Sequence, residues 1–150
     1  MIQTLNRIFE LDAFRELNTE ESSWLQEKSK LRRFKKGEFI YSPGNPSSSV
    51  LFVVEGRVKL GAFNNDGKEM IKHIFFQNEL FGIMAISNQK VRANYSEAMD
   101  EYNEILEIDV FDMKRLMQKN ASFSLGISKI MGDRLVQFQE RIESLMFKDT

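Results

Sequence analysis

The sequence predicts a mainly β fold with flanking helices, and three observations carry that prediction. Apolar and polar residues alternate with a period of two through much of residues 31–108. Turn signals rich in Gly, Pro, Asn and Asp separate these runs at intervals of about 8–12 residues, which favours a barrel or roll over a parallel α/β sheet. After residue 109 the apolar period becomes that of a helix.

The N-terminal part of the chain is predicted to be helical. A helix should begin after Asn18, because Asn18 and Glu21 have the spacing of a capping box, and it should run to about Lys28. The residues before it are expected to be helical and then irregular, with apolar anchors at Ile2, Leu5, Ile8, Phe9 and Phe14.

Short strands and turns are predicted for the middle of the chain. The run at 50–54 is apolar throughout, which is typical of a strand buried on both faces. Asn-Asn-Asp-Gly at 64–67 is a strong hairpin signal. The other strands are expected from residue 31, and at 39–41, 57–63, 69–76, 96–99 and 104–108.

A long helix is predicted at 122–146, after a shorter one that begins at Asp109. The long helix would span about 25 residues, or roughly 37 Å. One interpretation is that it packs only on its own domain. We favour a homodimer seam, because the helix is longer than a small barrel needs and its apolar stripe steps by four and three residues, as in a coiled coil. The stripe consists of Met131, Leu135, Phe138, Ile142 and Leu145.

Composition limits the chemistry that the chain can perform. Its 150 residues fit one domain, or one domain with an appendage, and they contain no cysteine and a single histidine, His73. No catalytic or metal-binding set, haem or iron–sulfur cluster is therefore expected, and the protein is predicted not to be an enzyme. His73 is interpreted as a hydrogen-bonded histidine within a strand.

Charge and hydropathy point away from membranes and from direct nucleic-acid binding. The chain has 21 basic and 22 acidic residues, whereas a nucleic-acid-binding domain usually has a basic excess. The one basic run, at 28–36, fits the solvated face of a strand; a phosphate-binding patch is the alternative. No apolar run approaches the ~20 residues of a membrane span. No secretory signal is visible, so a cytoplasmic protein is expected.

The stretch 78–95 is the candidate functional site. A glycine before a short apolar turn can present backbone N–H groups to an anion, and an arginine nearby can neutralise it. The alternative is that Arg92 is a solvated surface charge, or that it pairs with Glu97 or Asp100. In that alternative the neighbouring apolar residues are simply core, namely Phe81, Ile83, Met84 and Ile86.

The order of elements, taken with several short motifs, resembles the sensor half of the Crp/Fnr family of bacterial transcription regulators. The resemblance covers essentially the whole chain, and its specificity comes from the order and spacing of the motifs. They are 36–40 (Lys-Gly-Glu-Phe-Ile), Pro43-Gly44, 53–59 (Val-Val-Glu-Gly-Arg-Val-Lys), 66–69 (Asp-Gly-Lys-Glu), 79–82 (Glu-Leu-Phe-Gly), Arg92, Arg134-Leu135 and 145–149 (Leu-Met-Phe-Lys-Asp).

The resemblance implies a double-stranded β-helix, that is, a jelly-roll or cupin-like roll, followed by a long dimerisation helix. It implies a cyclic-nucleotide-binding-like roll at 1–121 and a dimerisation helix and hinge at 122–150. The family's winged helix-turn-helix has no counterpart here, so we expect a fragment of a regulator that senses an effector and would contact DNA only through a missing domain. The alternative is a ligand-free dimerisation module.

The resemblance also implies a modified nucleotide pocket. Gly82 and Arg92 match the family's cassette, in which the arginine holds the cyclic phosphate. Ile83 stands where a glutamate would accept from the ribose hydroxyl, and Ala93 replaces a Ser or Thr. A small anionic effector is expected, but these two departures argue against tight cyclic AMP binding. The candidate ligand-binding residues are Gly82, Ile83, Met84, Ala85, Arg92, Ala93, Phe138 and Gln139.

Overall fold

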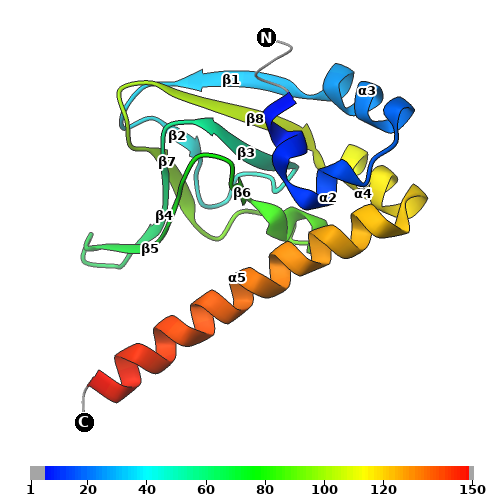
Figure 1. Cartoon of the computed structure of the whole chain (residues 1–150). Coiled ribbons are helices and arrows are strands. Elements are labelled where there is room, and N and C mark those ends of the chain that lie inside the picture. Colours follow the sequence, from blue (N-terminus) through cyan, green and yellow to red (C-terminus); the bar gives the residue numbers. More distant parts are fainter. Residues whose placement is uncertain (1–5, 149–150) are drawn as a thin grey trace.

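The computed structural model describes residues 6–148 and shows two four-stranded antiparallel sheets flanked by helices (Figure 1). One sheet has the strand order β1-β8-β3-β6, and the other has the order β2-β7-β4-β5. The strands are β1 (Lys30–Phe34), β2 (Phe39–Tyr41), β3 (Ser49–Glu55), β4 (Val58–Phe63), β5 (Glu69–Phe75), β6 (Leu80–Phe81), β7 (Tyr95–Ala98) and β8 (Asn103–Asp109).

Strand β3 separates two hydrophobic cores, which explains its unbroken apolar sequence. Val50, Phe52 and Val54 point into the core beneath the helices, whereas Leu51 and Val53 point into the core between the two sheets. Successive side chains of a strand point to opposite faces, so a strand with helices on one side and a sheet on the other is apolar at every position. The predicted burial of both faces is confirmed.

The N-terminal helices begin where the sequence indicates. The capping box is present: the side chain of Asn18 accepts from the backbone N–H of Glu21 at 2.8 Å, and the backbone N–H of Asn18 donates to the Glu21 carboxylate at 3.0 Å. Of the predicted anchors, Ile8 and Phe14 are fully buried, whereas Ile2 and Leu5 lie outside the described residues. The elements are the 3-10 helix η1 (Asn6–Glu10), α2 (Asp12–Arg15) and α3 (Thr19–Lys28).

Two helices follow the last strand. Helix α4 (Val110–Lys119) is capped by the Asp109 carboxylate, which accepts from the N–H of Phe111 at 2.8 Å. Helix α5 (Ala121–Lys148) packs beneath the roll with its N-terminal part, and its C-terminal part projects past it (Figure 1). No helix within residues 6–148 is long and apolar enough to cross a membrane.

The predicted fold class is confirmed at the level of mainly antiparallel sheets, flanking helices and a long C-terminal helix. The narrower description as a double-stranded β-helix, with its jelly-roll or cupin-like topology, stays a prediction. The division into a roll at 1–121 and a dimerisation helix at 122–150 also stays a prediction. The start of α5 packs against α2 and α4, which belong to the first of these two parts.

Candidate functional site

A cavity of about 390 Å³ lies where the roll meets α5. Its walls come from β2, β4 and β5, from the short 3-10 helix η2 (Ile83–Ser87), from the segment that leads into β7, and from α5. Six of the predicted ligand-binding residues line it, one of which (Phe138) also belongs to the predicted seam, together with two further seam residues. These residues are Gly82, Ile83, Met84, Arg92, Ala93 and Phe138, with Met131 and Leu135.

Two predicted ligand-binding residues do not line this cavity. Ala85 is buried on the other side of η2, and Gln139 is exposed on α5. Their binding roles stay predictions, and within one chain the structure gives neither of them a place in the cavity wall.

Position 82 requires a glycine for two reasons, its backbone conformation and the closeness of the Arg92 side chain. Its φ of 68° is left-handed, a conformation that residues with a Cβ rarely adopt. A Cβ at this position would also stand 3.0 Å from Nη1 of Arg92. The glycine therefore lets the arginine lie directly against the backbone at the start of η2.

Arg92 is the buried cation of the cavity, with a relative exposure of 4%. Its Nη1 donates to the carbonyl of Gly82 at 2.9 Å, its Nη2 donates to the carbonyl of Ser49, and its guanidinium lies 4.3 Å from the centre of the Tyr41 ring. Its Nε is buried without a hydrogen-bond partner among the described residues. Burial lowers the pKa of Arg92, because a charge is less stable away from water.

The alternative interpretations of Arg92 are wrong. It is not a solvated surface charge, and it pairs with neither of the nearby acids. Asp100 is bound by Arg57 at 2.7 Å, and Glu97 lies 3.7 Å from Lys59. Glu97 lies within β7 and Asp100 just after it, whereas Arg92 precedes the strand and is buried.

Several cavity residues were not identified from the sequence, and Tyr41 and Arg134 are the most important of them. Burial raises the pKa of the Tyr41 hydroxyl, and it lowers the pKa of Arg134. Arg134 comes from α5 and lies 4.9 Å from the centre of the Phe75 ring. The Arg134-Leu135 motif was the available signal for Arg134, although no binding role was assigned to it; no local pattern marks Tyr41. The others are Leu60, Phe75, Gln89, Asn94 and Gly132.

The electrostatic balance of the cavity favours an anion. Among the described residues, two guanidinium groups line it and no carboxylate does. Gln89 Oε1 already accepts from the Ser47 hydroxyl at 2.9 Å, and Asn94 Oδ1 is buried without a partner among the described residues. No group of side chains within residues 6–148 is arranged to hold a metal ion. The site can therefore bind and orient an anion, and nothing in its wall supplies a nucleophile with a base.

His73 differs from its prediction. Its Nδ1 lies 3.3 Å from Nη2 of Arg141, but its Nε2 is buried without a hydrogen-bond partner in the described chain. Burial and the positive charge of Arg134 lower its pKa. The residue lies on β5 as expected, yet only one of its two ring nitrogens has a polar partner among the described residues. Two arginines of α5, Arg134 and Arg141, act on the ring through their charge.

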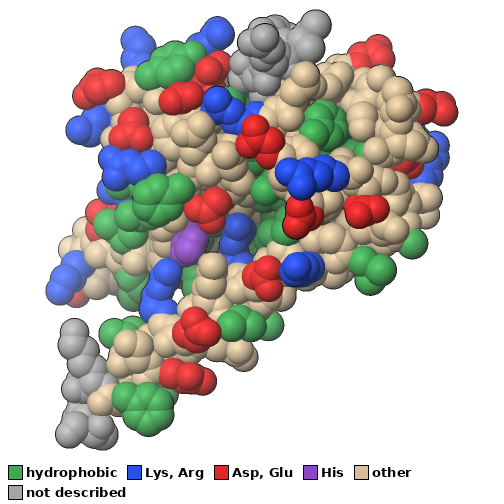
Figure 2. Space-filling view, viewed as in Figure 1, with side chains coloured by type: hydrophobic (Ala, Val, Ile, Leu, Met, Phe, Trp, Pro, Cys, Tyr) green, Lys and Arg blue, Asp and Glu red, His purple; other side chains and the backbone are tan. Residues whose placement is uncertain are grey.

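The predicted seam follows α5 outward from the cavity. Met131 and Phe138 are half-buried against the roll, whereas Leu135, Ile142 and Leu145 are 59%, 58% and 62% exposed. Figure 2 shows hydrophobic side chains on the surface of this projecting part of the helix. The same stripe thus begins in the cavity wall and ends in solvent.

Comparison with known proteins agrees with this architecture. Residues 31–120 match the family described as "Cyclic nucleotide-binding domain". The global nitrogen regulator of Nostoc sp. is 25% identical over 118 residues, which cover 77% of this chain and 52% of that protein. The CRP-like cAMP-activated global transcriptional regulator of Mycobacterium tuberculosis is 21% identical over 116 residues, which cover 77% and 51%. Both are named as regulators and not as enzymes, and the chain spans about half their length.

Solved structures show the same fold. The sensor domain of the transcriptional regulator DNR from Pseudomonas aeruginosa superposes with a TM-score of 0.76 at 17% identity, covering 87% of this chain and 92% of that one. The catabolite activator protein of Thermus thermophilus gives a TM-score of 0.73 at 21% identity, covering 90% of this chain and 63% of that one. The chain therefore belongs to the cyclic nucleotide-binding domain family, with homologues among the Crp/Fnr-family transcription regulators.

Proposed function

We propose that this chain is the effector-sensing and dimerisation domain of a Crp/Fnr-like bacterial transcription regulator. The observation that carries the proposal is Arg92, a buried cation that faces a cavity whose described wall residues include no carboxylate. A buried charge without a counter-ion is costly, and an anionic ligand would offset that cost. Because α5 forms one wall of the cavity, such a ligand would also contact the helix that we propose to dimerise.

The effector is proposed to be a small organic anion other than cyclic AMP. Ile83 has no acceptor for a ribose hydroxyl, and desolvating that hydroxyl without a partner costs roughly 1–3 kcal/mol. Ala93 offers no hydroxyl to a phosphate. The remaining wall is largely apolar, so it suits a ligand with a compact apolar body.

Thermal melting with a panel of anions tests the proposal. The panel contains cyclic nucleotides, inorganic phosphate and small carboxylates. A ligand at 100 times its Kd adds about 2.7 kcal/mol of stability, which raises the melting temperature. Arg92→Gln should remove this shift and Arg92→Lys should retain part of it. Arg57→Gln is the matched control, because Arg57 lies outside the cavity and pairs with Asp100.

The alternative is a ligand-free dimerisation module that keeps the fold. It predicts that no member of the panel raises the melting temperature of the wild-type protein, and that result would overturn the sensing proposal. A shift that survives in Arg92→Gln would place the ligand elsewhere and would overturn the role of Arg92.

Dimerisation is proposed to use the seam of α5, formed by Met131, Leu135, Phe138, Ile142 and Leu145. Ile142→Glu would bring two carboxylates into that seam, so sedimentation should show a monomer in place of a dimer. Gln137→Glu adds the same charge at an exposed position off the stripe and should leave the dimer intact. A monomeric wild-type protein, or an Ile142→Glu variant that still dimerises, would contradict the seam.

In the whole protein, the proposed output is a shift between two arrangements of the paired α5 helices. A ligand changes such an equilibrium only through a difference in its affinity for the two states. Contact with DNA would be made by a segment outside these 150 residues. The protein is proposed to act in the cytoplasm.

A further inference from the structure

We propose that His73 and Arg141 form an acid-sensitive latch, which holds the outer part of α5 against strand β5. The latch is closed when His73 is neutral, and a proton bound by His73 opens it. The signal that this inference adds to the proposed function is therefore a proton. It acts in a separate groove, so it can be tested without knowledge of the effector.

The latch lies in a groove of about 600 Å³ between β5 and the outer part of α5. Among the described strands, β5 is the last of its sheet, so one edge of its backbone is open to other contacts. Arg141 of α5 donates to the carbonyl of Lys72, and its Nη2 lies 3.3 Å from Nδ1 of His73. One side chain of the helix thus contacts two successive residues of the edge strand.

The geometry indicates which proton the His73 ring carries in the closed latch. A guanidinium can only donate, so Nδ1 accepts from Arg141 and the proton of the neutral ring lies on Nε2. Nε2 is buried without a hydrogen-bond partner among the described residues. Because one ring nitrogen is paired and the other is not, the latch should be held closed by only a small free energy.

A second proton on the ring would turn the contact from attraction to repulsion. Nδ1 would become a donor, and it would face the Arg141 guanidinium, which is also a donor, at 3.3 Å. The imidazolium would be partly buried between the positive charges of Arg134 and Arg141. A charged ring in this place is costly, because it loses water and meets like charges.

The charged groups around His73 come from two elements that pack against β5. Arg134 and Arg141 on α5 disfavour the protonated ring, whereas Glu79, in the turn after β5, favours it. Glu140 of α5 also lines the groove. The neighbouring strand β4 presents Leu60 opposite His73, which has no charge. Positive charge therefore predominates next to the ring.

The outer part of α5 has a second possible partner, so opening of the latch has a consequence. Phe138 packs edge-on against His73 with ring centres 5.6 Å apart, and it also belongs to the proposed seam. Ile142 and Leu145 follow it in the seam and are exposed. A closed latch keeps Phe138 on the roll, and an open latch leaves it available to the seam. Acid should thus change how the helices of two copies pair.

Distances between two spin labels test the latch in the full chain. The chain has no cysteine, so Lys68→Cys in the β4–β5 turn and Glu143→Cys on α5 define both label positions. An excess of unlabelled protein restricts the measurement to distances within one chain. Pulsed electron paramagnetic resonance at pH 7.5 should show one short distance. Below pH 6.5 a longer distance should appear, with the ratio of open to closed chains rising by up to about tenfold per pH unit.

Three variants of the labelled chain assign the response to the latch. His73→Gln keeps an acceptor and does not titrate, so its distance should stay short from pH 7.5 to pH 5. Arg141→Met removes the donor, so the longer distance should be present at every pH. Lys72→Gln is the matched control: it removes an exposed charge beside His73 but keeps the carbonyl that binds Arg141, and it should respond to pH as the wild-type protein does.

A fourth variant tests the direction of the electrostatic effect. Glu79→Gln keeps the acceptor for the backbone N–H of Phe76, which lies 2.8 Å away, and removes the negative charge that favours protonated His73. The pH at which half of the chains are open should therefore fall. A residue with a purely structural role would not move this midpoint.

The outcomes separate this inference from the effector proposal. A distance that stays the same between pH 7.5 and pH 5 in the wild-type protein overturns the latch. A pH response that persists in His73→Gln assigns the effect to another group and also overturns it. Both results leave the role of Arg92 to be decided by the anion panel.

Discussion

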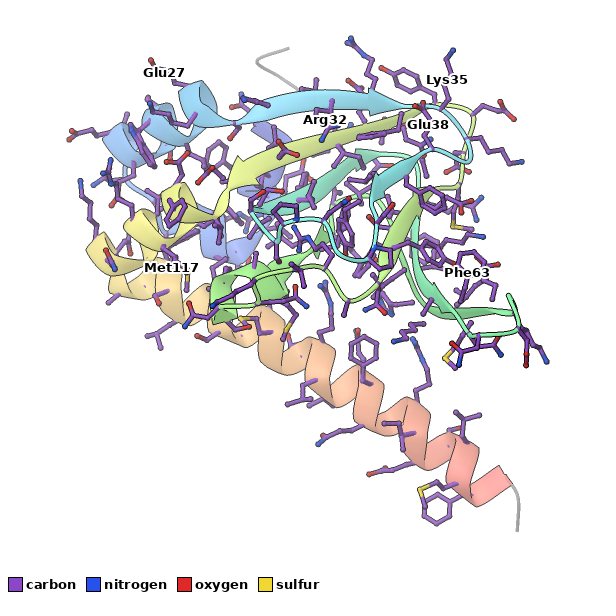
Figure 3. All side chains as sticks on the ribbon, turned by 180° about the vertical axis from the view of Figure 1, so that it is seen from behind. Glu27, Arg32, Lys35, Glu38, Phe63 and Met117 are labelled. Atoms are coloured by element: carbon purple, nitrogen blue, oxygen red, sulfur yellow. The ribbon has the colours of Figure 1, made fainter. Side chains whose placement is uncertain are left out.

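The two halves of α5 are attached to the roll by different kinds of contact. The inner half, residues 121–130, buries Phe123 and Ile127 completely, and Phe123 packs edge-on against Phe14 with ring centres 5.1 Å apart. The outer half, residues 131–147, is mostly exposed, and its side chains project toward the roll on one side and into open space on the other (Figure 3). There, Met131 and Phe138 are only half-buried against the roll, and Arg141 donates to the carbonyl of Lys72 on β5 and approaches His73.

The difference separates a structural part of the helix from a part that is suited to change position. Apolar burial contributes to the global free energy of unfolding. The inner half of α5 is held by such burial, so it should separate from the roll only when the hydrophobic core unfolds. Surface polar contacts contribute little, so they can be exchanged for others at small cost. The outer half of such a helix can change its contacts with the roll while the inner half stays packed in the core.

The largest effect should come from the core contact of the inner half. Phe123→Ala removes a fully buried ring and should lower the free energy of unfolding by about 3–5 kcal/mol, measured by urea denaturation. Leu125→Ala is the control, because Leu125 is 71% exposed on the same turn of helix; it should change stability by about 0.5 kcal/mol or less. Equal losses in the two variants would show that the inner half is not anchored through Phe123.

Two glycines test the comparison with the same substitution in each half. A Cβ on Gly126 would stand 2.7 Å from the backbone of Ala13 in α2, so Gly126→Ala should cost roughly 1–3 kcal/mol. A Cβ on Gly132 meets nothing within 4 Å, so Gly132→Ala should stabilise the helix by up to about 1 kcal/mol. Urea denaturation measures both, and the same sign in both variants would contradict the proposed difference in packing.

The smallest effect should be a pH dependence at the outer contact. Burial, then Arg134 and Arg141, lower the pKa of His73, and Glu79 opposes them. The folded protein therefore binds this proton more weakly than the unfolded chain does. The related stability is fully present above the unfolded value of 6.5 and is lost as the pH falls through the folded pKa.

Melting temperatures measured across this pH range test the assignment. His73→Gln keeps an acceptor for Arg141 but does not titrate, so its melting temperature should fall less steeply than that of the wild-type protein below pH 6.5. Identical slopes in the two proteins would mean that His73 does not contribute.

Much of the fold could be predicted because it is encoded locally. The capping box at Asn18, the apolar strand around Phe52 and the cap at Asp109 each depend on neighbours in the sequence, and all three are present. The predicted homodimer seam and the ligand-binding roles stay predictions, because they depend on molecules outside this chain.

The site was only partly predictable because its geometry is made by distant segments. Gly82 and Arg92 lie close in sequence and were recognised together. Their partners Ser49 and Tyr41 come from other strands, and Arg134 comes from α5. The burial of Arg92 follows from those long-range contacts, and no local pattern distinguishes it from a surface arginine.

Strand β1 forms the edge of its sheet, so one side of its backbone is open to solvent. Such an edge can template pairing with another molecule and so promote aggregation. Arg32 and Arg33 are exposed on this strand, and Figure 3 shows Arg32 on it and Lys35 near its end. A second β1 that approached edge to edge would bring like charges together. Arg32 and Arg33 also pair with Glu107 and Glu104 on β8. The basic run should thus disfavour edge-to-edge pairing between the sheets of two copies.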